Sequence, residues 1–403
     1  MFKSFKIGSI YGIPIKLDVT FLLILPIFAW VIAWQVDQLV EMIDLIFGTD
    51  LHANPLEEGY MPLIVGLVAA LGLFACVLLH ELGHSIAAIR YGFPIESITL
   101  WLLGGVAQLS ENPTNWRQEL VIAIAGPIVS VALGVGLWVS VYLIPTAYNA
   151  TIFIVAYLAL MNLVLAAFNM LPGFPMDGGR VLRALLARNQ PFAVATAQAA
   201  RVGKLFALML GLFGLLAFNF ILIALALFIY IAATGESRYV ALQAALEGVQ
   251  VRDLMTPAAE LDVVSPELTV DRLLELMYRE RHTGFPVIDD GHIAGIVTLD
   301  DVRTISPEDR QHTVVADVMT TELETVKPDD EAFAALEQLQ SNDIGRVLVV
   351  TDRGDLAGLV TRTDIVRSLS IGSVRAVRDI PAAGPEQAAE VDSVPAVEGR
   401  PRW

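Results

Sequence analysis

The chain has 403 residues, of which 55% are hydrophobic, and its mean hydropathy is +0.61. This is too apolar for an ordinary soluble enzyme of the same length, so we expect the chain to lie in a lipid bilayer. The formal net charge of -17 argues against nucleic acid as a partner, because a phosphate backbone is bound by a basic face.

The apolar character is confined to the first part of the chain. Long apolar runs end near Thr234, and the sequence beyond them is charged. There are 10 Lys and Arg residues and 12 Asp and Glu residues before Gly235, against 16 and 31 after it. We therefore expect a polytopic α-helical membrane domain over residues 1–235, followed by an acidic soluble part.

We expect six transmembrane helices in this domain, because a helix needs about 20 apolar residues to cross a bilayer. The first four predicted spans are Leu17–Val36, Met61–His84, Leu120–Leu143 and Thr151–Met170. The apolar stretch Val202–Ala233 is too long for one helix and short for two. Turn-forming residues inside it, such as Gly214 and Asn219, permit a tight hairpin, so we interpret the stretch as spans five and six.

Basic residues are confined to alternate loops between these spans. They lie before span one, between spans two and three, and between spans four and five, whereas loops 37–60 and 144–150 contain six acidic residues and no Lys or Arg. Lys and Arg collect in short cytoplasmic loops. The pattern predicts a multi-pass protein of the cell membrane with both termini in the cytoplasm.

A candidate metal motif, His80-Glu81-Leu82-Gly83-His84, ends the second span. Two imidazoles four residues apart share one face of a helix, and a carboxylate stands beside the first, which suits zinc. The alternative is a chance match whose histidines occupy core or helix-end positions. Because ionisable residues at the end of an apolar span are costly and usually functional, we favour the metal. A catalytic zinc needs a third protein ligand; no further histidine is near, so a carboxylate must supply it.

The segment Ile95–Leu109, between spans two and three, mixes β-branched and aromatic residues around Gly104-Gly105. This composition predicts a β-hairpin, which we expect to be associated with the membrane. An unpaired edge of that hairpin could accept an extended peptide.

Asp177 is the candidate for the third ligand. It follows a run rich in Pro and Gly, Asn169-Met-Leu-Pro-Gly-Phe-Pro-Met-Asp177-Gly-Gly, at the cytoplasmic end of the fourth span. Irregular backbone at membrane depth is tolerated only where it is buried in protein or lines a wet cavity. The alternative is a helix terminator and turn without further function. The two histidines at the same depth favour a site.

These motifs resemble those of the site-2 proteases, which carry a membrane His-Glu-x-x-His and a distant Asn-x-x-Pro-x-x-Pro-x-Asp-Gly segment. Ala125-Gly126-Pro127 on the third span is similar to a small-residue motif of the same family. The resemblance implies one zinc per chain, bound by His80, His84 and Asp177, with Glu81 as general base. It implies that Asn169 holds the substrate backbone or the developing oxyanion.

The soluble part contains an internal repeat. Val251–Thr256 recurs as Val315–Thr320, and Gly295–Val302 recurs as Gly358–Ile365, with a period near 63 residues. Each repeat has a helical pattern and a short apolar strand. The predicted helices are Val270–Glu280 and Asp330–Ser341, and the predicted strands are Phe285–Asp289 and Val347–Val350. We expect α/β domains at 248–308 and 312–371, and a disordered tail over 372–403.

The repeats resemble a pair of cystathionine-β-synthase (CBS) domains, which implies an adenine nucleotide as regulator and a homodimer through these domains. By the resemblance, Thr298 with Asp301 and Thr361 with Asp364 face a ribose and phosphate, and Arg346 reaches a phosphate. The alternative is that each Thr–Asp pair only caps a helix. We expect one of the two clefts to be occupied.

Together these patterns predict an intramembrane zinc endopeptidase that cleaves transmembrane segments of substrate proteins and is regulated by nucleotide binding to cytoplasmic CBS domains. The alternative is a metal-ion transporter or a nucleotide-regulated channel, because histidines and carboxylates within spans also mark ion pathways. The polar residues cluster at one end of the membrane rather than crossing it, which favours the protease. A third possibility is an inactive, ligand-binding descendant, which the complete motif argues against.

Overall fold

The computed structural model describes residues 4–101, 104–109, 113 and 115–368. Contacts divide the chain into two compact units, an N-terminal unit up to Ala241 and a C-terminal unit from Leu242 on. The tail predicted at 372–403 lies outside the described residues.

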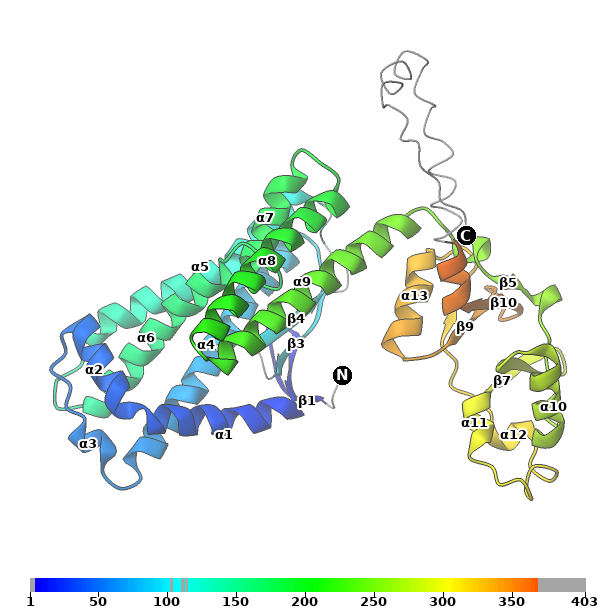
Figure 1. The fold of residues 1–403 in the computed structure, drawn as a ribbon, viewed down its shortest axis with the longest axis horizontal. Helices are drawn as coiled ribbons and strands as arrows, with labels where there is room; N and C mark the ends of the chain where they lie inside the picture. Colours follow the sequence, from blue (N-terminus) through cyan, green and yellow to red (C-terminus); the bar gives the residue numbers. More distant parts are fainter. Residues whose placement is uncertain (1–3, 102–103, 110–112, 114, 369–403) are drawn as a thin grey trace, which may run out of the picture. The chain divides into compact units, whose positions relative to one another are not determined.

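Helices make up most of the N-terminal unit (Figure 1). They are α1 (Val19–Trp34), α2 (Val36–Phe47), α3 (Asn54–Glu57), α4 (Met61–Arg90), α5 (Trp116–Val141), α6 (Asn149–Asn169), α7 (Asp177–Ala187), α8 (Phe192–Leu216) and α9 (Phe220–Leu246). Within the described ranges, α4, α5, α6, α8 and α9 are each long and apolar enough to cross a membrane. Helices α1 and α2 are bent by 70° at their junction and would make a sixth span if counted as one. The prediction of six spans holds only on that count.

The last two spans are longer than the sequence suggested. Helix α8 starts ten residues before Val202, and α9 continues well beyond Ala233. Charged residues lie within both extensions, Arg201 in α8 and Glu236 and Arg238 in α9, so neither extension belongs to an uninterrupted apolar run. The turn between them is held by Asn219, whose Oδ1 accepts hydrogen bonds from the backbone N–H groups of Ile221 and Leu222 at 3.1 and 3.2 Å.

A four-stranded sheet in the order β1-β2-β3-β4 belongs to the same unit. Its strands are β1 (Ser4–Ile10), β2 (Ile13–Asp18), β3 (Ile95–Trp101) and β4 (Gly104–Leu109). Strands β3 and β4 pair antiparallel, as predicted for Ile95–Leu109, and β2 runs parallel to β3. The association of this hairpin with the membrane stays a prediction. The two N-terminal strands were not predicted. Ile13 of β2 and Ile98 of β3 are buried in one small core with Leu82 of α4, so the sheet packs on the helix that carries the metal motif.

Helix α5 is central to the helical packing, because it contacts α4, α6 and α7. Its buried face is built of small residues, including Gly126, Ser130 and Gly134. A Cβ atom at Gly126 would lie 2.2 Å from Nε2 of His84, so only glycine lets α5 approach the imidazole this closely.

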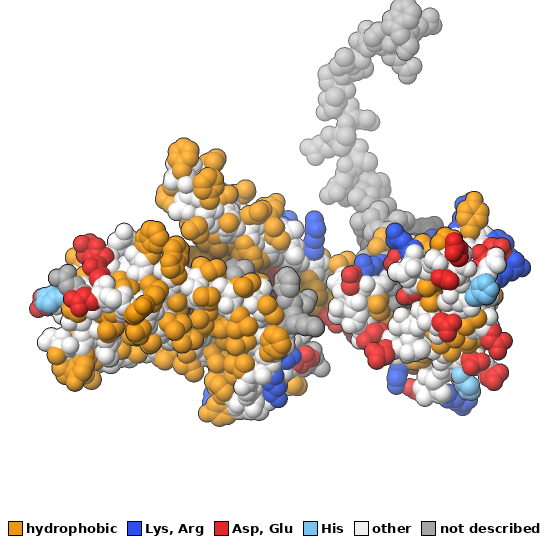
Figure 2. Space-filling view, turned by 90° about the horizontal axis from the view of Figure 1, so that it is seen from below, with side chains coloured by type: hydrophobic (Ala, Val, Ile, Leu, Met, Phe, Trp, Pro, Cys, Tyr) orange, Lys and Arg blue, Asp and Glu red, His pale blue; other side chains and the backbone are white. Residues whose placement is uncertain are grey.

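The C-terminal unit contains the two predicted α/β repeats. Its elements are 3₁₀ turns at Val251–Asp253 and Ala258–Glu260, β5 (Thr256–Pro257), α10 (Val270–Glu280), β6 (Gly284–Asp289), β7 (His292–Thr298), α11 (Leu299–Arg303), α12 (Val315–Val318), β8 (Thr325–Val326), α13 (Ala332–Ser341), β9 (Arg346–Val350) and β10 (Leu356–Thr361). The predicted helices and strands match α10, α13, β6 and β9 to within two residues. Figure 2 shows hydrophobic side chains over much of the N-terminal unit and many charged side chains on this one.

The two repeats exchange their first strands. Strand β5, from the first repeat, pairs with β10 of the second, while Thr320 near the start of the second repeat bridges to Ile296 in β7 of the first. The duplicated segments Val251–Thr256 and Val315–Thr320 are therefore the places where the chain crosses between repeats. Neither repeat completes its sheet alone, so the pair folds together.

Candidate metal centre and nucleotide pocket

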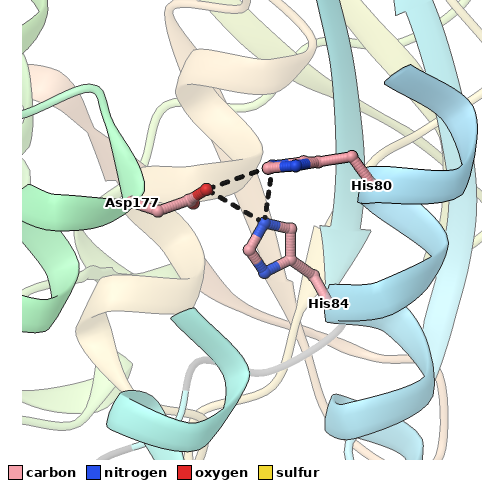
Figure 3. A group of neighbouring side chains, drawn as sticks. All are labelled: His80, His84 and Asp177. Atoms are coloured by element: carbon pink, nitrogen blue, oxygen red, sulfur yellow. Dashed lines mark hydrogen bonds and ion pairs between the residues drawn. The ribbon is translucent and has the colours of Figure 1, made fainter. Parts of the chain in front are cut away.

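The structure brings His80, His84 and Asp177 together. The two imidazoles project from α4 toward the carboxylate at the first residue of α7 (Figure 3). Oδ2 of Asp177 lies 3.1 Å from Nε2 of His80 and 3.2 Å from Nε2 of His84, and the two Nε2 atoms are 3.2 Å apart. Asp177 thus faces the imidazole pair, as the sequence predicted, although 93 residues separate it from His84.

The outer nitrogen of each imidazole is held by α5. Nδ1 of His84 donates to the backbone carbonyl of Ile122 at 2.7 Å, and Nδ1 of His80 lies 2.8 Å from Oγ of Ser130. A carbonyl can only accept, so a neutral His84 carries its proton on Nδ1 and presents a lone pair at Nε2. Hydrogen bonds of this kind fix the ring orientation of metal-binding histidines.

This donor set fits a zinc ion. Lone pairs on two nitrogens and a carboxylate oxygen converge, and such acceptors repel one another unless a cation lies between them. One proton can bridge only two of the three atoms, whereas a metal ion contacts all three. Their mutual spacing is also close to that of the ligand atoms around tetrahedral zinc, about 3.3 Å. Within the described residues, this is the group of His, Cys, Asp and Glu side chains whose ligand atoms converge for a metal.

Glu81 lies against Gly105 of β4, the last strand in the sheet order. A Cβ atom at position 105 would come within 2.4 Å of Cγ and 3.4 Å of Oε1 of Glu81. Only a residue without a side chain leaves room for the carboxylate here. The carboxylate lies in the electrostatic field of His84, His80 and Asp177. It therefore adjoins both the metal ligands and the strand predicted to bind a peptide.

Asn169, the last residue of α6, also reaches this centre. Its Nδ2 lies 3.4 Å from Nε2 of His80. A side-chain amide at that place can donate a hydrogen bond to a substrate carbonyl or to an oxyanion. The structure thus groups Asn169 with the four residues of the predicted active site.

Sequence reasoning missed three contributors to this site. They are the hydroxyl of Ser130, the backbone carbonyl of Ile122 and the space left by Gly105. Ser130 lies four residues after Gly126 and hence on the same face of α5, which could have pointed to it. A backbone carbonyl leaves no trace in sequence, so Ile122 could not have been found.

A second candidate site is a pocket of about 480 Å³ in the C-terminal unit, lined by residues of both repeats. Thr298, Asp301 and Arg346 are among the lining residues, whereas Thr361 and Asp364 are not. Nη2 of Arg346 donates to Oγ1 of Thr283 at 2.9 Å. Burial lowers the pKa of Arg346, and the nearby carboxylate of Asp301 partly offsets this effect.

Both Thr–Asp pairs already have a structural role as helix caps. The backbone N–H and the hydroxyl of Thr298 each donate to Oδ2 of Asp301 at 2.7 Å. The corresponding bonds from Thr361 to Oδ2 of Asp364 are 2.9 and 2.7 Å. Capping therefore accounts for both pairs, and the pocket distinguishes the first pair from the second.

Comparison with protein families gives two matches. The description "Peptidase family M50" matches residues 68–151 and 139–211, and "CBS domain" matches residues 251–308 and 315–371. The first match contains His80, Glu81, His84, Asn169 and Asp177. The second contains the residues of the pocket.

Individual relatives cover nearly the whole chain. The zinc metalloprotease MJ0392 of Methanocaldococcus jannaschii is 34% identical over 368 residues, which are 91% of this chain and 96% of that protein. A protein named Rip3 from Mycobacterium tuberculosis is 32% identical over 92% of this chain and 94% of its own length. Among solved structures, the site-2 protease from M. jannaschii shares 36% identity and covers 58% of this chain and 95% of that structure, with a TM-score of 0.41.

Proposed function

The chain belongs to peptidase family M50, the site-2 proteases, as a zinc metalloprotease with tandem CBS domains, and we propose that it cleaves transmembrane segments of other membrane proteins. The observation that carries this proposal is the convergence of His80, His84 and Asp177, with Glu81 on the same helix as the imidazoles. His80, Glu81 and His84 lie in α4, an apolar helix that is long enough to span a bilayer. The peptide bonds closest to such a centre are those of a membrane-embedded substrate.

The chemistry follows from the residues around the centre. His80, His84 and Asp177 would hold the zinc ion, which would act as a Lewis acid and lower the pKa of water toward about 7. Glu81 takes the proton of the attacking water and returns it to the leaving amine. Asn169 donates a hydrogen bond from its side-chain amide to the oxygen of the scissile carbonyl as negative charge develops there. Ser130 and Ile122 hold the two imidazole rings in place throughout.

Strand β4 is proposed to bind the substrate backbone. A transmembrane helix satisfies its own amides and must unwind before attack. Strand β4 is last in the sheet order, and its Gly105 touches Glu81. A peptide added to that edge would pass beside the general base. Replacing Gly104 and Gly105 with proline should abolish cleavage without releasing zinc, and unchanged cleavage would remove this part of the proposal.

Regulation is proposed to act through an adenine nucleotide in the C-terminal pocket. Arg346 offers a partly buried cation to a phosphate, and Thr298 with Asp301 offers polar groups to a ribose. Asp300, Glu322 and Glu324 also line the pocket, which favours a nucleotide with few phosphate charges or one carrying a divalent cation. We further propose one occupied cleft per chain, a homodimer through the CBS domains at 248–308 and 312–371, and cytoplasmic termini.

The substitution Glu81→Gln tests the proposed reaction, because it keeps the shape of the side chain but removes its basicity. Membrane proteomics of cells with either form of the full chain should show a helix-containing fragment that vanishes in the variant. Cleavage by purified protein in proteoliposomes should fall by about 10²- to 10⁴-fold with zinc retained. Glu96→Gln, an exposed carboxylate on β3, is the matched control. Metal flux that persists in Glu81→Gln, with proteolysis absent in both forms, would support a transporter instead.

A further inference from the structure

Arg183 of α7 is a buried arginine that binds two carboxylates from different helices. Its side chain is 9% exposed. Nε donates to Oε1 of Glu119 on α5 at 2.6 Å, and Nη1 donates to Oε1 of Glu236 on α9 at 2.5 Å. The Glu119 side chain is 3% exposed and that of Glu236 33%. A buried ion pair of this kind is costly to form, and removing one partner is more costly still. None of the reaction steps above uses it.

Two aromatic rings fix the same guanidinium. Cζ of Arg183 lies 4.9 Å from the ring centre of Phe174 and 4.7 Å from that of Phe192. Phe174 belongs to the irregular segment that leads into α7, three residues before Asp177. Arg183 lies six residues after Asp177 on the helix that Asp177 begins. Arg183 therefore fixes the chain on both sides of Asp177. It contacts Phe174 in the segment before Asp177, and it belongs to the helix that Asp177 begins.

Helix α5 connects this arginine to the histidine ligands. Glu119 precedes Ile122 by three residues, one turn of α5, and the Ile122 carbonyl accepts the hydrogen bond from His84. One turn of α5 thus orients an imidazole of α4 and anchors the helix of Asp177. The relative position of ligands that come from α4 and α7 depends on this shared turn.

Glu236 of α9 completes a network of three charged residues, Arg183, Glu119 and Glu236. Its ion pair with Arg183 is the weaker of the two, because Glu236 is more exposed than Glu119. With all three groups ionised, two carboxylates face one guanidinium, and Oε2 of Glu119 is buried with no hydrogen-bond partner among the described residues. Arg183 and Glu119 would form a neutral pair without Glu236, which is the more exposed of the two acids. Helix α9 continues to Leu246, a few residues before the first CBS match at 251. A displacement of α9 would therefore change the charge balance around Arg183.

We infer that Arg183 is a positioning residue that keeps Asp177 against the two imidazoles. Through its ion pair with Glu236, the position of Arg183 also depends on the position of α9. The inference rests on the proposed role of His80, His84 and Asp177 as zinc ligands. Among the described residues, the hydrogen bonds and ion pairs of Arg183 are with Glu119 and Glu236 and with none of the metal ligands, so it acts on the reaction through Asp177.

Zinc retention by the full-length protein tests the inference without any substrate. The zinc-loaded chain in detergent is mixed with excess chelator, and the rate of zinc loss is measured. Arg183→Gln should lose zinc about tenfold faster or more, as partners outside the ligand shell usually affect metal affinity by about 10- to 100-fold. Arg183→Lys keeps the charge without the planar guanidinium, so its rate of zinc loss should be intermediate.

Glu236→Gln should increase the rate of zinc loss less than Glu119→Gln does. In proteoliposomes, Arg183→Gln should lower kcat with KM unchanged.

The matched control is Arg188→Gln, which removes an exposed arginine five residues along the chain, outside the network. Its zinc loss should equal that of the unaltered protein. If Arg183→Gln does not fold, Arg183→Lys and Phe174→Leu decide the question, since both leave the buried volume nearly filled. Folded Arg183 variants that retain zinc normally would overturn the inference. Absence of proteolysis in the unaltered chain would reject the proposed function and leave the zinc result standing.

Discussion

The metal centre and the Thr–Asp pairs of the repeats both match sequence motifs, but the structure explains their residues differently. Thr298 donates to Asp301 and Thr361 to Asp364, so each pair is satisfied as a helix cap. The three groups of the metal centre face one another at 3.1 to 3.2 Å, where one metal ion can contact all three atoms, whereas a proton can bridge only two. A motif indicates function most strongly where local structure gives its residues no other partner.

Removing one of the metal ligands should have the largest effect on zinc content and cleavage of all the substitutions that test the difference between the metal centre and the helix caps. His84→Ala leaves two of three ligands, so zinc content should fall from about one ion per chain to near zero. Cleavage should fall by about 10³-fold or more. Metal analysis of the purified chain and a proteoliposome assay measure the two outcomes. His52→Ala, in an exposed loop, should change neither. Full zinc content in His84→Ala would contradict the reading of the centre as a metal site.

The substitution Gly105→Ala tests the position of the general base Glu81 independently of zinc binding. A methyl group at this position meets Cγ of Glu81 at 2.4 Å, so either the carboxylate or β4 must move. A displacement near 1 Å can cost about 100-fold in rate. We expect a loss of that order in kcat with full zinc content. Gly136→Ala is the matched control, because a Cβ there meets nothing within 4 Å. Normal cleavage by Gly105→Ala would show that Glu81 and β4 are not tightly coupled.

Ser130→Ala tests whether the hydroxyl on α5 supports the metal. It removes the partner of Nδ1 of His80 and leaves the imidazole free to rotate. Zinc affinity should fall by about 10- to 100-fold, measured by competition with a chelator. Ser140→Ala, on the same helix, removes only a hydrogen bond to the Leu137 carbonyl and should leave affinity unchanged. Equal affinities for the two variants would assign Ser130 to packing alone.

Most of the architecture follows from local sequence patterns, and the exceptions have physical causes. The spans that became α4, α5 and α6 were predictable because each is a long apolar run, and the repeats of the C-terminal unit because their segments recur along the chain. Strand β1 was missed because most of its residues are exposed and its alternation of polar and apolar residues breaks at Gly8-Ser9. At the site, His80, His84 and Asp177 were found by residue type. Arg183 was assigned to cytoplasmic charge, since nothing local shows that Glu119 and Glu236 meet it.

The smallest effects on stability are expected for Thr298→Ala and Thr361→Ala. These two substitutions test whether each Thr–Asp pair acts as a helix cap. Each removes a hydroxyl that donates to a carboxylate at 2.7 Å. Both should lower the free energy of unfolding of the C-terminal unit by about 1 kcal/mol, the usual value of an N-cap. Thermal or denaturant unfolding of the full chain measures this loss, and the two variants should agree.

Nucleotide binding should then distinguish the two variants. Thr298 lines the pocket and Thr361 does not. If the pocket takes an adenine nucleotide, Thr298→Ala should weaken AMP binding by about fivefold, the equivalent of one hydrogen bond, while Thr361→Ala leaves it unchanged. Calorimetric titration of the full chain with AMP measures both. Equal weakening in the two variants would mean that AMP binding depends on the stability of the C-terminal unit and not on a contact with Thr298. The pair Thr298 and Asp301 would then be only a helix cap, like Thr361 and Asp364.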